Sequence, residues 1–362
     1  MAGSRKDKKV RIGIIGTGSI ANAHAFACSA IPNVEIVALA DIAQGAAESF
    51  SDRHGIDAPI FSNHHDLLAM GGLDAVTVCT PNDVHAPISI DAIKAGKHVL
   101  CEKPMSASIA DAKAMVVAAR KSKVRTMTGY TKRFFKGSRF LHDLLRREDL
   151  GRVFHIRACY LQSWLSNPNT PIVWRLEQNR TGSGVLGVLG SHITDLAQFI
   201  MGDTITRVNG MMKTFTSERP TMTGSRKKQK VDVDDACMFG AEFESGAMGV
   251  FEAPRNATGH PDYWRIEIDA EKGAVSYDNV DGRVLHSTQD GPARHAGWVE
   301  LNIPNRYGAR GREFQNEVNH FVECITNKET PVPSFEEAFK TERVLDAVVR
   351  SSQKGKAVDV ET

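Results

Sequence analysis

The sequence predicts a two-domain α/β protein, in which an N-terminal doubly wound parallel sheet is followed by an α+β domain with a large, mostly antiparallel open sheet. Three observations support this fold class. The chain has 362 residues, more than a single hydrophobic core normally serves. Strand-like and helix-like segments alternate up to about residue 130. Beyond that point, strands with alternating polar and apolar residues prevail.

Five short segments are rich in β-branched residues and almost continuously apolar, as is typical of buried parallel strands. They are VRIGIIG (10–16), VEIVALAD (34–41), DAVTVCTP (74–81), KHVLCEKP (97–104) and VRTMTGY (124–130). Segments with helical periodicity lie between them, such as 19–30, 85–96 and 108–122. The predicted N-terminal domain, a Rossmann-like doubly wound sheet, spans residues 8–130.

The second predicted domain spans residues 131–362. Alternating segments predict an open sheet with one face exposed or covered by a partner, and ESGA (244–247) predicts a hairpin turn. The polar segment 217–230, with Pro220 and Gly224, is predicted to be a surface loop. Two helices close the chain, the second capped by Ser334 with Glu337 three residues later. This last helix is a candidate for packing back on the N-terminal domain.

Composition and charge narrow the class of partner. Hydrophobic residues make up 41% of the chain, charged residues 24%, and the net charge is only +2. We therefore expect no nucleic-acid partner, and we interpret the basic run SRKDKKV (4–10) as a solvated terminus. No run of about 18 apolar residues indicates a membrane span. Six cysteines without a CxxC pair favour a reduced, cytoplasmic protein without a metal site.

A glycine turn follows the first predicted strand and opens the first helix. The segment GTGSIA contains Gly16, Thr17, Gly18, Ser19 and Ile20, with Ala21 where the dinucleotide-binding fingerprint has Gly or Ala. The first glycine makes the tight turn, and the second lets backbone amides approach a pyrophosphate at the helix N-terminus. These residues are predicted to bind a dinucleotide.

Asp41 ends the second predicted strand, 25 residues after Gly16. A carboxylate there can accept hydrogen bonds from a ribose diol and would repel a 2′-phosphate, so the sequence favours NAD over NADP. The competing interpretation of Asp41 is a strand-end cap.

Polar residues also follow the third and fourth predicted strands. Thr80, Pro81, Asn82 and His85 come after the third strand, and Glu102 and Lys103 come after the fourth. Ligands of parallel α/β sheets bind beyond the carboxyl ends of the strands, so these residues are candidates for contacting the nicotinamide and its substrate. Alone, Thr-Pro-Asn is more often a turn, and Glu-Lys an exposed ion pair, but together at one crevice they are better interpreted as a site.

The motifs GTGSIANAH, CTPNDVH, CEKP and GSGVLGVLGSHITD, in this order, resemble those of the glucose-fructose oxidoreductase and inositol dehydrogenase family, called Gfo/Idh/MocA. The resemblance covers nearly the whole chain. It implies NAD(P)-dependent hydride transfer between nicotinamide and a secondary alcohol or ketone of a sugar, glycoside or cyclitol. It also implies a homodimer or homotetramer formed through the C-terminal sheet.

By this resemblance, Lys103 is the catalytic lysine, His192 is the acid/base, and Asp195 binds substrate hydroxyls. An imidazole titrates near neutrality and can take the hydroxyl proton, and an ammonium can stabilise a developing alkoxide. The alternative for His192 is an ordinary helix histidine. In the family, the residue four before the histidine is usually an aspartate, and here it is Val188.

Four further residues are candidate substrate ligands, each with a structural alternative. Tyr130 and Arg133 follow the fifth predicted strand and could instead anchor the domain junction. Trp174 and Arg175 could stack on a sugar and bind hydroxyls, or simply pack in the core.

Two other functions remain open at this point. The chain could be a non-catalytic regulator that responds to NAD or a sugar, because the fold of this family has regulatory members. It could also be a lyase or glycosidase that uses bound NAD transiently, without net redox change.

Overall fold

A computed structural model describes residues 9–147, 149–288 and 297–361. Most of the basic run 4–10, and residue 8, where the N-terminal domain is predicted to begin, lie outside these ranges. The chain divides into two compact units. The N-terminal unit comprises Met1–Thr131 and Arg312–Phe339, and the C-terminal unit comprises Lys132–Gly311 and Lys340–Thr362.

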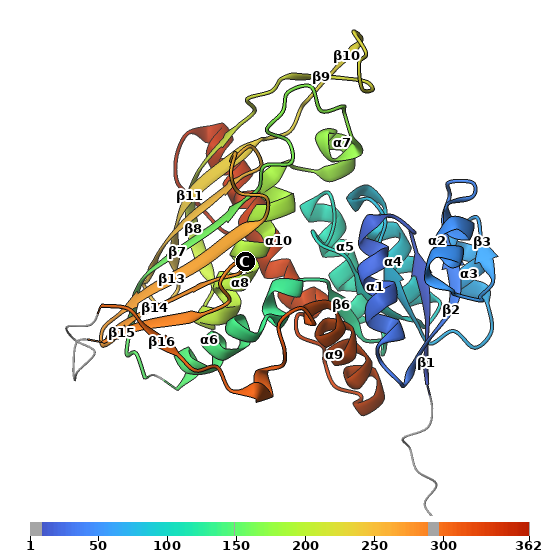
Figure 1. Ribbon diagram of the computed structural model, residues 1–362, viewed down its shortest axis with the longest axis horizontal. Coiled ribbons are helices and arrows are strands. Elements are labelled where there is room, and N and C mark those ends of the chain that lie inside the picture. The colour runs from blue at the N-terminus through green and yellow to red at the C-terminus, as the bar shows by residue number, and fades with distance from the viewer. Residues whose placement is uncertain (1–8, 148, 289–296, 362) are drawn as a thin grey trace, which may run out of the picture. The chain divides into compact units, whose positions relative to one another are not determined.

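The N-terminal unit contains a six-stranded, all-parallel sheet with the order β3-β2-β1-β4-β5-β6 (Figure 1). This topology confirms the predicted doubly wound fold. Its strands are β1 (Val10–Ile15), β2 (Val34–Ala40), β3 (Ile60–Phe61), β4 (Ala75–Val78), β5 (His98–Cys101) and β6 (Thr126–Thr128). The sequence analysis missed β3, because two residues form no recognisable pattern.

Helices alternate with these strands, as their apolar periodicity predicts. They are α1 (Ser19–Ser29), α2 (Ala46–His54), α3 (His64–Ala69), α4 (His85–Lys94), α5 (Ile109–Arg120) and, from the late segment, α9 (Glu313–Asn327). Asn63 and Ser108 cap α3 and α5, each accepting a hydrogen bond from a backbone N–H three residues later. β4 is fully buried, which explains its continuous apolar sequence.

The C-terminal unit is built on a nine-stranded sheet with the order β16-β15-β14-β13-β7-β12-β11-β8-β17. Every neighbouring pair is antiparallel except β7 with β12, which confirms the predicted mostly antiparallel sheet. Its strands are β7 (Val153–Leu161), β8 (Ile205–Lys213), β11 (Ala236–Phe243), β12 (Met248–Pro254), β13 (Tyr263–Ala270), β14 (Gly273–Asp278), β15 (Val284–Thr288), β16 (Val299–Leu301) and β17 (Val358–Asp359).

One face of this sheet is covered by helices of the same unit, and Figure 1 shows the other face without them. The covering helices are α6 (Lys136–Arg146), α8 (Ser191–Met201) and the second part of α10 (Phe335–Lys354), and the unit also contains the short helix α7 (Gln178–Thr181). β11 and β12 alternate between buried and exposed residues along almost their whole length. The exposed positions include Met211, Met238, Met248 and Val250, which are 48–65% exposed. The predicted exposed sheet face therefore carries an apolar patch.

The segment 217–230 differs from the predicted loop. It forms a two-stranded antiparallel hairpin of β9 (Glu218–Pro220) and β10 (Lys228–Lys230). Arg219 is fully buried, and its guanidinium donates to the carbonyls of Leu165 and Asn167 at 2.7 and 2.8 Å. Arginine is charged, so the hydropathy pattern gives no sign that this residue is buried and holds the segment to the rest of the protein.

The predicted turn and cap in the later part of the chain are both present. Gly246 has φ +86° in the hairpin between β11 and β12, where the amide of Phe243 bonds to the carbonyl of Ala247. The hydroxyl of Ser334 accepts from the amide of Glu337 at the start of α10. α10 is continuous across the boundary between the two units, since its first residues belong to one and the rest to the other.

The helical stretch Gln178–Met201 is long and apolar enough to be compared with a membrane span. It joins α7, a π-helical turn at Leu186–Gly190 and α8. Of its most apolar window, 83% is buried inside the protein. Its apolar character is thus that of a core helix against the nine-stranded sheet.

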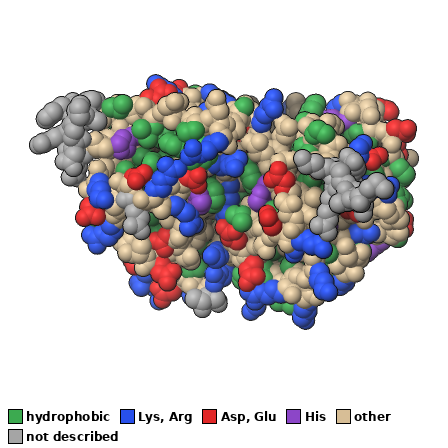
Figure 2. Space-filling view, turned by 90° about the horizontal axis from the view of Figure 1, so that it is seen from below, with side chains coloured by type: hydrophobic (Ala, Val, Ile, Leu, Met, Phe, Trp, Pro, Cys, Tyr) green, Lys and Arg blue, Asp and Glu red, His purple; other side chains and the backbone are tan. Residues whose placement is uncertain are grey.

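Figure 2 shows basic and acidic side chains interspersed over the face that it presents. This mixture accords with the net charge of +2.

Candidate functional site

The glycine turn after β1 has the backbone geometry that its sequence predicts. Gly16 has φ +86°, and a Cβ there would lie 2.9 Å from the carbonyl of Cys79, so only glycine fits. Gly18 is the N-cap of α1, and a Cβ there would meet no atom within 4 Å. No side chain caps the start of α1. Its first amides and the open space at Gly18 fit a dinucleotide phosphate.

Asp41 lies beside this turn and is already hydrogen-bonded. Its Oδ2 accepts from the backbone N–H and from the hydroxyl of Thr17, each at 2.8 Å. Its Oδ1 accepts from the N–H of Ala43 at 2.8 Å. The carboxylate therefore holds the glycine turn and also stands at the end of β2, where a ribose diol is expected. The two interpretations of Asp41, cap and ribose ligand, are compatible because each oxygen can accept more than one hydrogen bond.

The residues after β4 form a short 3-10 helix, Asn82–Val84, that leads into α4. Thr80 and Pro81 precede it, and Asn82 is buried within it. His85 is also buried, with Nε2 2.9 Å from the carbonyl oxygen of Thr80 and Nδ1 2.9 Å from that of Pro104. Burial lowers the pKa of His85. The imidazole therefore links two strand-end loops, and its predicted contact with the cofactor stays a prediction.

Lys103 follows β5 at the carboxyl end of the sheet, and Glu102 beside it is buried. Oε1 of Glu102 lies 2.8 Å from Nε2 of His24, which is on α1, and Oε2 accepts from the backbone N–H of Lys103 at 3.2 Å. Burial opposes ionisation of Glu102, but the hydrogen bond from His24 and the charges of His24 and Lys103 lower its pKa. Glu102 is thus an internal ion-pair partner, whereas Lys103 is only partly buried.

Tyr130, the candidate substrate ligand after β6, is fully buried in the hydrophobic core of the N-terminal unit. The adjacent hydroxyl of Thr131 donates to the carboxylate of Glu317 on α9, with oxygen distances of 3.1 and 3.2 Å. This environment supports the anchoring alternative for Tyr130.

In the C-terminal unit, a buried carboxylate holds the backbone where the π-helical turn before α8 begins. Asp234 accepts from the amides of Gly184 and Leu186 at 2.6 and 2.8 Å. Burial raises the pKa of Asp234. A Cβ on Gly184 would lie 2.1 Å from the carbonyl oxygen of Asp234, so the glycine permits this close approach.

The π-helical turn Leu186–Gly190 directly precedes α8, and Val188 lies within this turn while His192 is the second residue of α8. Single-turn π segments are frequent at functional sites. Val188 is half-buried and packs against the core of the C-terminal unit. His192 is 8% exposed, and its ring lies 5.8 Å from that of Tyr160. An apolar contact thus takes the place of the carboxylate expected at position 188.

Asp195 and Arg133, two predicted substrate ligands, bind each other. The guanidinium of Arg133 donates from Nε to Oδ2 and from Nη2 to Oδ1, both at 2.7 Å. Both residues are at most 4% exposed. This bidentate ion pair ties α8 to the 3-10 helix Thr131–Phe134. The predicted contacts of the two residues with a sugar stay predictions.

Trp174 and Arg175 lie together in the 3-10 helix Trp174–Leu176. The guanidinium of Arg175 is 4.3 Å from the centre of the indole ring, and that of Arg180 is 5.7 Å away. Trp174 therefore has cationic groups on its ring, and both candidate residues are partly accessible.

Comparison with known proteins shows to which family the chain belongs. Residues 10–130 match an oxidoreductase family with an NAD-binding Rossmann fold, and residues 138–276 match the Gfo/Idh/MocA C-terminal domain. The chain belongs to the Gfo/Idh/MocA oxidoreductase family. Its N-terminal unit is an NAD-binding Rossmann domain, and the family includes NAD-dependent sugar and cyclitol dehydrogenases.

Two relatives and one solved structure illustrate the similarity. The chain is 29% identical to levoglucosan dehydrogenase of Pseudarthrobacter phenanthrenivorans, over 98% of both proteins. It is 26% identical to myo-inositol 2-dehydrogenase of Thermotoga maritima, over 97% of this chain and 99% of the relative. A structure of levoglucosan dehydrogenase with NADH and L-sorbose superimposes with a TM-score of 0.93 at 28% identity, over 98% of this chain and all of the other.

Within this Gfo/Idh/MocA protein, sequence reasoning missed three residues that support the site. His24 and Asp234 hold Glu102 and Gly184 from distant parts of the chain, and Tyr160 lies against His192. His24 is the last residue of the GTGSIANAH motif, and its position on the helix that follows the glycine turn is the signal that could have identified it. Neither Asp234 nor Tyr160 lies in any motif.

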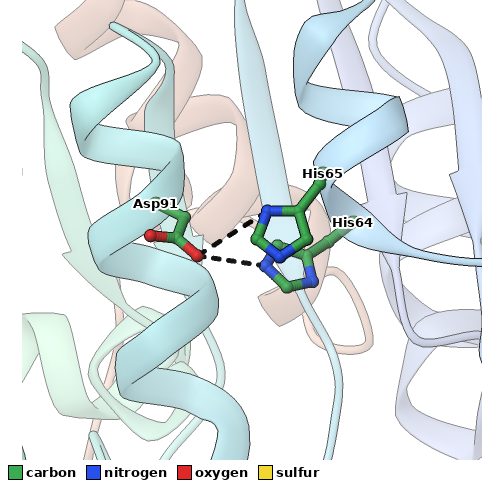
Figure 3. Close-up of side chains that lie close together, drawn as sticks. All are labelled: His64, His65 and Asp91. Atoms are coloured by element: carbon green, nitrogen blue, oxygen red, sulfur yellow. Dashed lines mark hydrogen bonds and ion pairs between the residues drawn. The ribbon is translucent and has the colours of Figure 1, made fainter.

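One cluster in the Rossmann domain has the residue types of a metal site (Figure 3). The ligand atoms of His64, His65 and Asp91 all lie within 4.8 Å of one another. His64 and His65 open α3, whose N-terminal dipole disfavours a cation, and the ammonium of Lys94 is 3.5 Å from Asp91. The hydrogen bond between His64 and Asp91, at 3.3 Å, accounts for this arrangement without an ion.

Proposed function

We propose that this protein is an NAD-dependent dehydrogenase that oxidises a secondary alcohol of a sugar, glycoside or cyclitol, or reduces the corresponding ketone. One observation carries the proposal: Lys103 follows β5 at the same carboxyl end of the parallel sheet as the uncapped glycine turn after β1. An ammonium beside a dinucleotide site suits a substrate that develops negative charge on oxygen.

In the proposed mechanism, Lys103 and His192 both act on the reacting hydroxyl. His192 takes the hydroxyl proton on a ring nitrogen, and the Lys103 ammonium stabilises the oxygen as its negative charge develops. Bound NAD would supply the nicotinamide ring that accepts the hydride from the carbon that bears the reacting hydroxyl. The Gly16–Gly18 turn would hold its pyrophosphate, and Asp41 its adenosine ribose.

The Arg133–Asp195 pair has a supporting role in this proposal. Because Arg133 satisfies both carboxylate oxygens, the pair fixes the first turns of α8 and with them the ring of His192. Asp195 would still accept hydrogen bonds from substrate hydroxyls, because each carboxylate oxygen can accept more than one. The sugar would also meet accessible groups such as Trp174 and Arg175, whose ring and guanidinium suit C–H faces and hydroxyls.

The test follows reduced-nicotinamide absorbance while levoglucosan, cyclitols, hexoses and glycosides are offered with NAD or NADP. We expect stoichiometric NADH formation with at least one polyol. Lys103→Met and His192→Asn should each lower kcat by about a hundredfold or more, while NAD binding changes little. Tight NAD binding without turnover of any polyol would favour the regulator, and product formation without NADH would favour the lyase or glycosidase.

We also propose that two copies of the chain pair through the exposed face of the nine-stranded sheet. The apolar patch of Met211, Met238, Met248 and Val250 lies beside alternating charges on the same face, including Arg157 and Glu267, whose side chains are 3.1 Å apart. A face with apolar residues and charges of both signs suits a self-complementary contact.

The oligomer is tested by sedimentation. The unmodified chain should sediment as a dimer or tetramer, and Met238→Lys with Val250→Lys should shift it to monomer without loss of the folded circular dichroism spectrum. A native chain that sediments as a monomer at micromolar concentration would refute this assembly.

We further propose a cytoplasmic location, with which the free thiols of all six cysteines accord.

A further inference from the structure

A buried imidazole–carboxylate pair lies directly behind the backbone of Lys103. We propose that His24 is a positioning residue that fixes Lys103 through the carboxylate of Glu102. This inference rests on the proposed function, in which Lys103 meets the substrate hydroxyl. It assigns a task to a histidine that has no part in the proposed chemistry.

The contacts form a continuous path from α1 to the lysine. His24 is the sixth residue of α1 and is fully buried. Its Nε2 lies 2.8 Å from Oε1 of Glu102, and Oε2 of the same carboxylate accepts from the N–H of Lys103 at 3.2 Å. One carboxylate therefore uses its two oxygens to connect an imidazole on the cofactor helix with the backbone at Lys103.

The packing around this carboxylate leaves it little freedom. A Cβ on Gly129 would lie only 3.2 Å from Oε1 of Glu102, so this glycine makes room for the carboxylate. The ring of Phe314 from α9 also meets the imidazole of His24 edge-on, with centres 6.0 Å apart. Movement of Glu102 would therefore require its neighbours to move as well.

Charge supports the same interpretation. Burial alone would lower the pKa of His24, but the nearby Cys79 and Glu102 outweigh burial and raise it well above its ordinary value. Glu102 in turn has a lowered pKa, for which His24 is the main partner and Lys103 a further one. A buried carboxylate kept ionised by His24 presents a fixed negative charge to Lys103.

The position of His24 gives the pair a functional meaning. α1 begins at the glycine turn, where its uncapped amides suit a pyrophosphate, and the same helix carries His24. The helix that orients the dinucleotide would thus also orient the lysine that acts beside the nicotinamide. Reacting groups must be held within a fraction of an ångström of one geometry. A single helix that positions both the dinucleotide and Lys103 would help to meet this requirement.

The first experiment separates positioning from binding by steady-state kinetics. His24→Gln and Glu102→Gln should each lower kcat by about tenfold or more, whereas the KM for NAD should stay within about threefold. The double variant should be no slower than the slower single variant, because both changes break one contact. His64→Gln is the matched control, since it alters the half-exposed His64–Asp91 pair of the same domain (Figure 3) and should leave kcat unchanged.

A second readout uses the protein without substrate or cofactor. Acetic anhydride labels lysines, and peptide mass spectrometry gives the acetylation rate of Lys103. His24→Gln and Glu102→Gln should accelerate this reaction by about threefold or more at fixed pH, because a fixed carboxylate no longer favours the ammonium form. Lys97, whose ammonium donates to the carbonyl of Leu73, serves as the internal reference and should be unaffected.

The two failures can be told apart. If the native chain oxidises no polyol and Lys103→Met changes nothing, the proposed function fails, and the acetylation rates still test the structural link. If the native chain is active but both readouts of folded His24→Gln and Glu102→Gln match those of His64→Gln, His24 has no positioning role. Thermal melting of each variant verifies that it is folded.

Discussion

The two units hold their candidate groups in different ways. In the N-terminal unit, the polar groups stand at the carboxyl ends of parallel strands, in loops such as the one carrying Lys103. In the C-terminal unit, His192 stands on α8, a helix that covers one face of the nine-stranded sheet. A parallel sheet buried on both faces offers only its ends for chemistry, whereas a sheet with one free face has room for a partner there.

The difference extends to the supporting ion pairs. His24–Glu102 ties a loop to a helix in the first unit, and Arg133–Asp195 ties a helix to a 3-10 turn in the second. Both pairs are almost completely buried. Each site therefore depends on charges that must be satisfied inside the protein, which makes the pairs sensitive points for mutation.

The largest expected effect comes from breaking the pair in the C-terminal unit. Arg133→Met leaves the Asp195 carboxylate buried without its guanidinium, which should cost about 3–5 kcal/mol and lower the Tm by about 10 °C. Differential scanning calorimetry measures this shift.

Removing both charges should recover much of the loss. Arg133→Met combined with Asp195→Leu leaves no buried charge at this place, so the Tm should rise again by at least about half of the drop. A double variant as unstable as the sum of the two single changes would show that the pair stabilises the unit through more than its mutual contact.

The next largest effect is expected at the end of β2 in the N-terminal unit. Asp41→Ala should lower the ratio of kcat/KM for NAD to that for NADP by about ten- to a hundredfold, the range for hydrogen bonds to a charged group. Thr17→Val is the matched control, because it removes one hydrogen bond to Asp41 and keeps the carboxylate. Equal use of both cofactors by the native chain would contradict the assignment of Asp41.

A smaller change is expected at the π-helical turn of the C-terminal unit. Val188→Asp restores the carboxylate that is usual in the family four residues before His192, and kcat should rise by about tenfold with little change in NAD affinity. Val188→Asn, which adds polarity without charge, should give less. An unchanged or reduced kcat of Val188→Asp would mean that the site has been rebuilt around the valine.

The smallest effect is expected from the half-exposed pair of the N-terminal unit. His64→Gln should change the free energy of unfolding by no more than about 1 kcal/mol, because solvent screens the contact with Asp91. A much larger loss, measured by urea denaturation, would show that this accessible pair contributes as much to stability as the buried pairs.

The sequence was sufficient for features set by short-range chemistry. The positive φ at Gly16, the cap at Ser334 and the hairpin turn at Gly246 each follow from local residue preferences. Alternation of apolar residues likewise predicted which sheet has an exposed face. These signals lie within a few residues of the structure that they specify.

Polar partners were a different matter. Arg133 and Asp195 were both predicted as site residues, but no sequence pattern indicated that they bind each other across 62 residues. The pair of His24 and Glu102 spans 78 residues. Which charges meet depends on how whole elements pack, and hydropathy carries no information about such pairing. The same holds for the buried Arg219, which anchors a segment expected to be a loop.

The division of the chain has a consequence for its synthesis on the ribosome. The N-terminal unit is not finished when residue 131 has emerged, because Arg312–Phe339 also belongs to it. Phe335 fills its core, and the amide of Thr128 on β6 bonds to the carbonyl of Pro333. A nascent chain halted before residue 312 would hold all six parallel strands and still leave this edge and core open. We therefore expect it to need chaperones until the last thirty or so residues of the unit arrive.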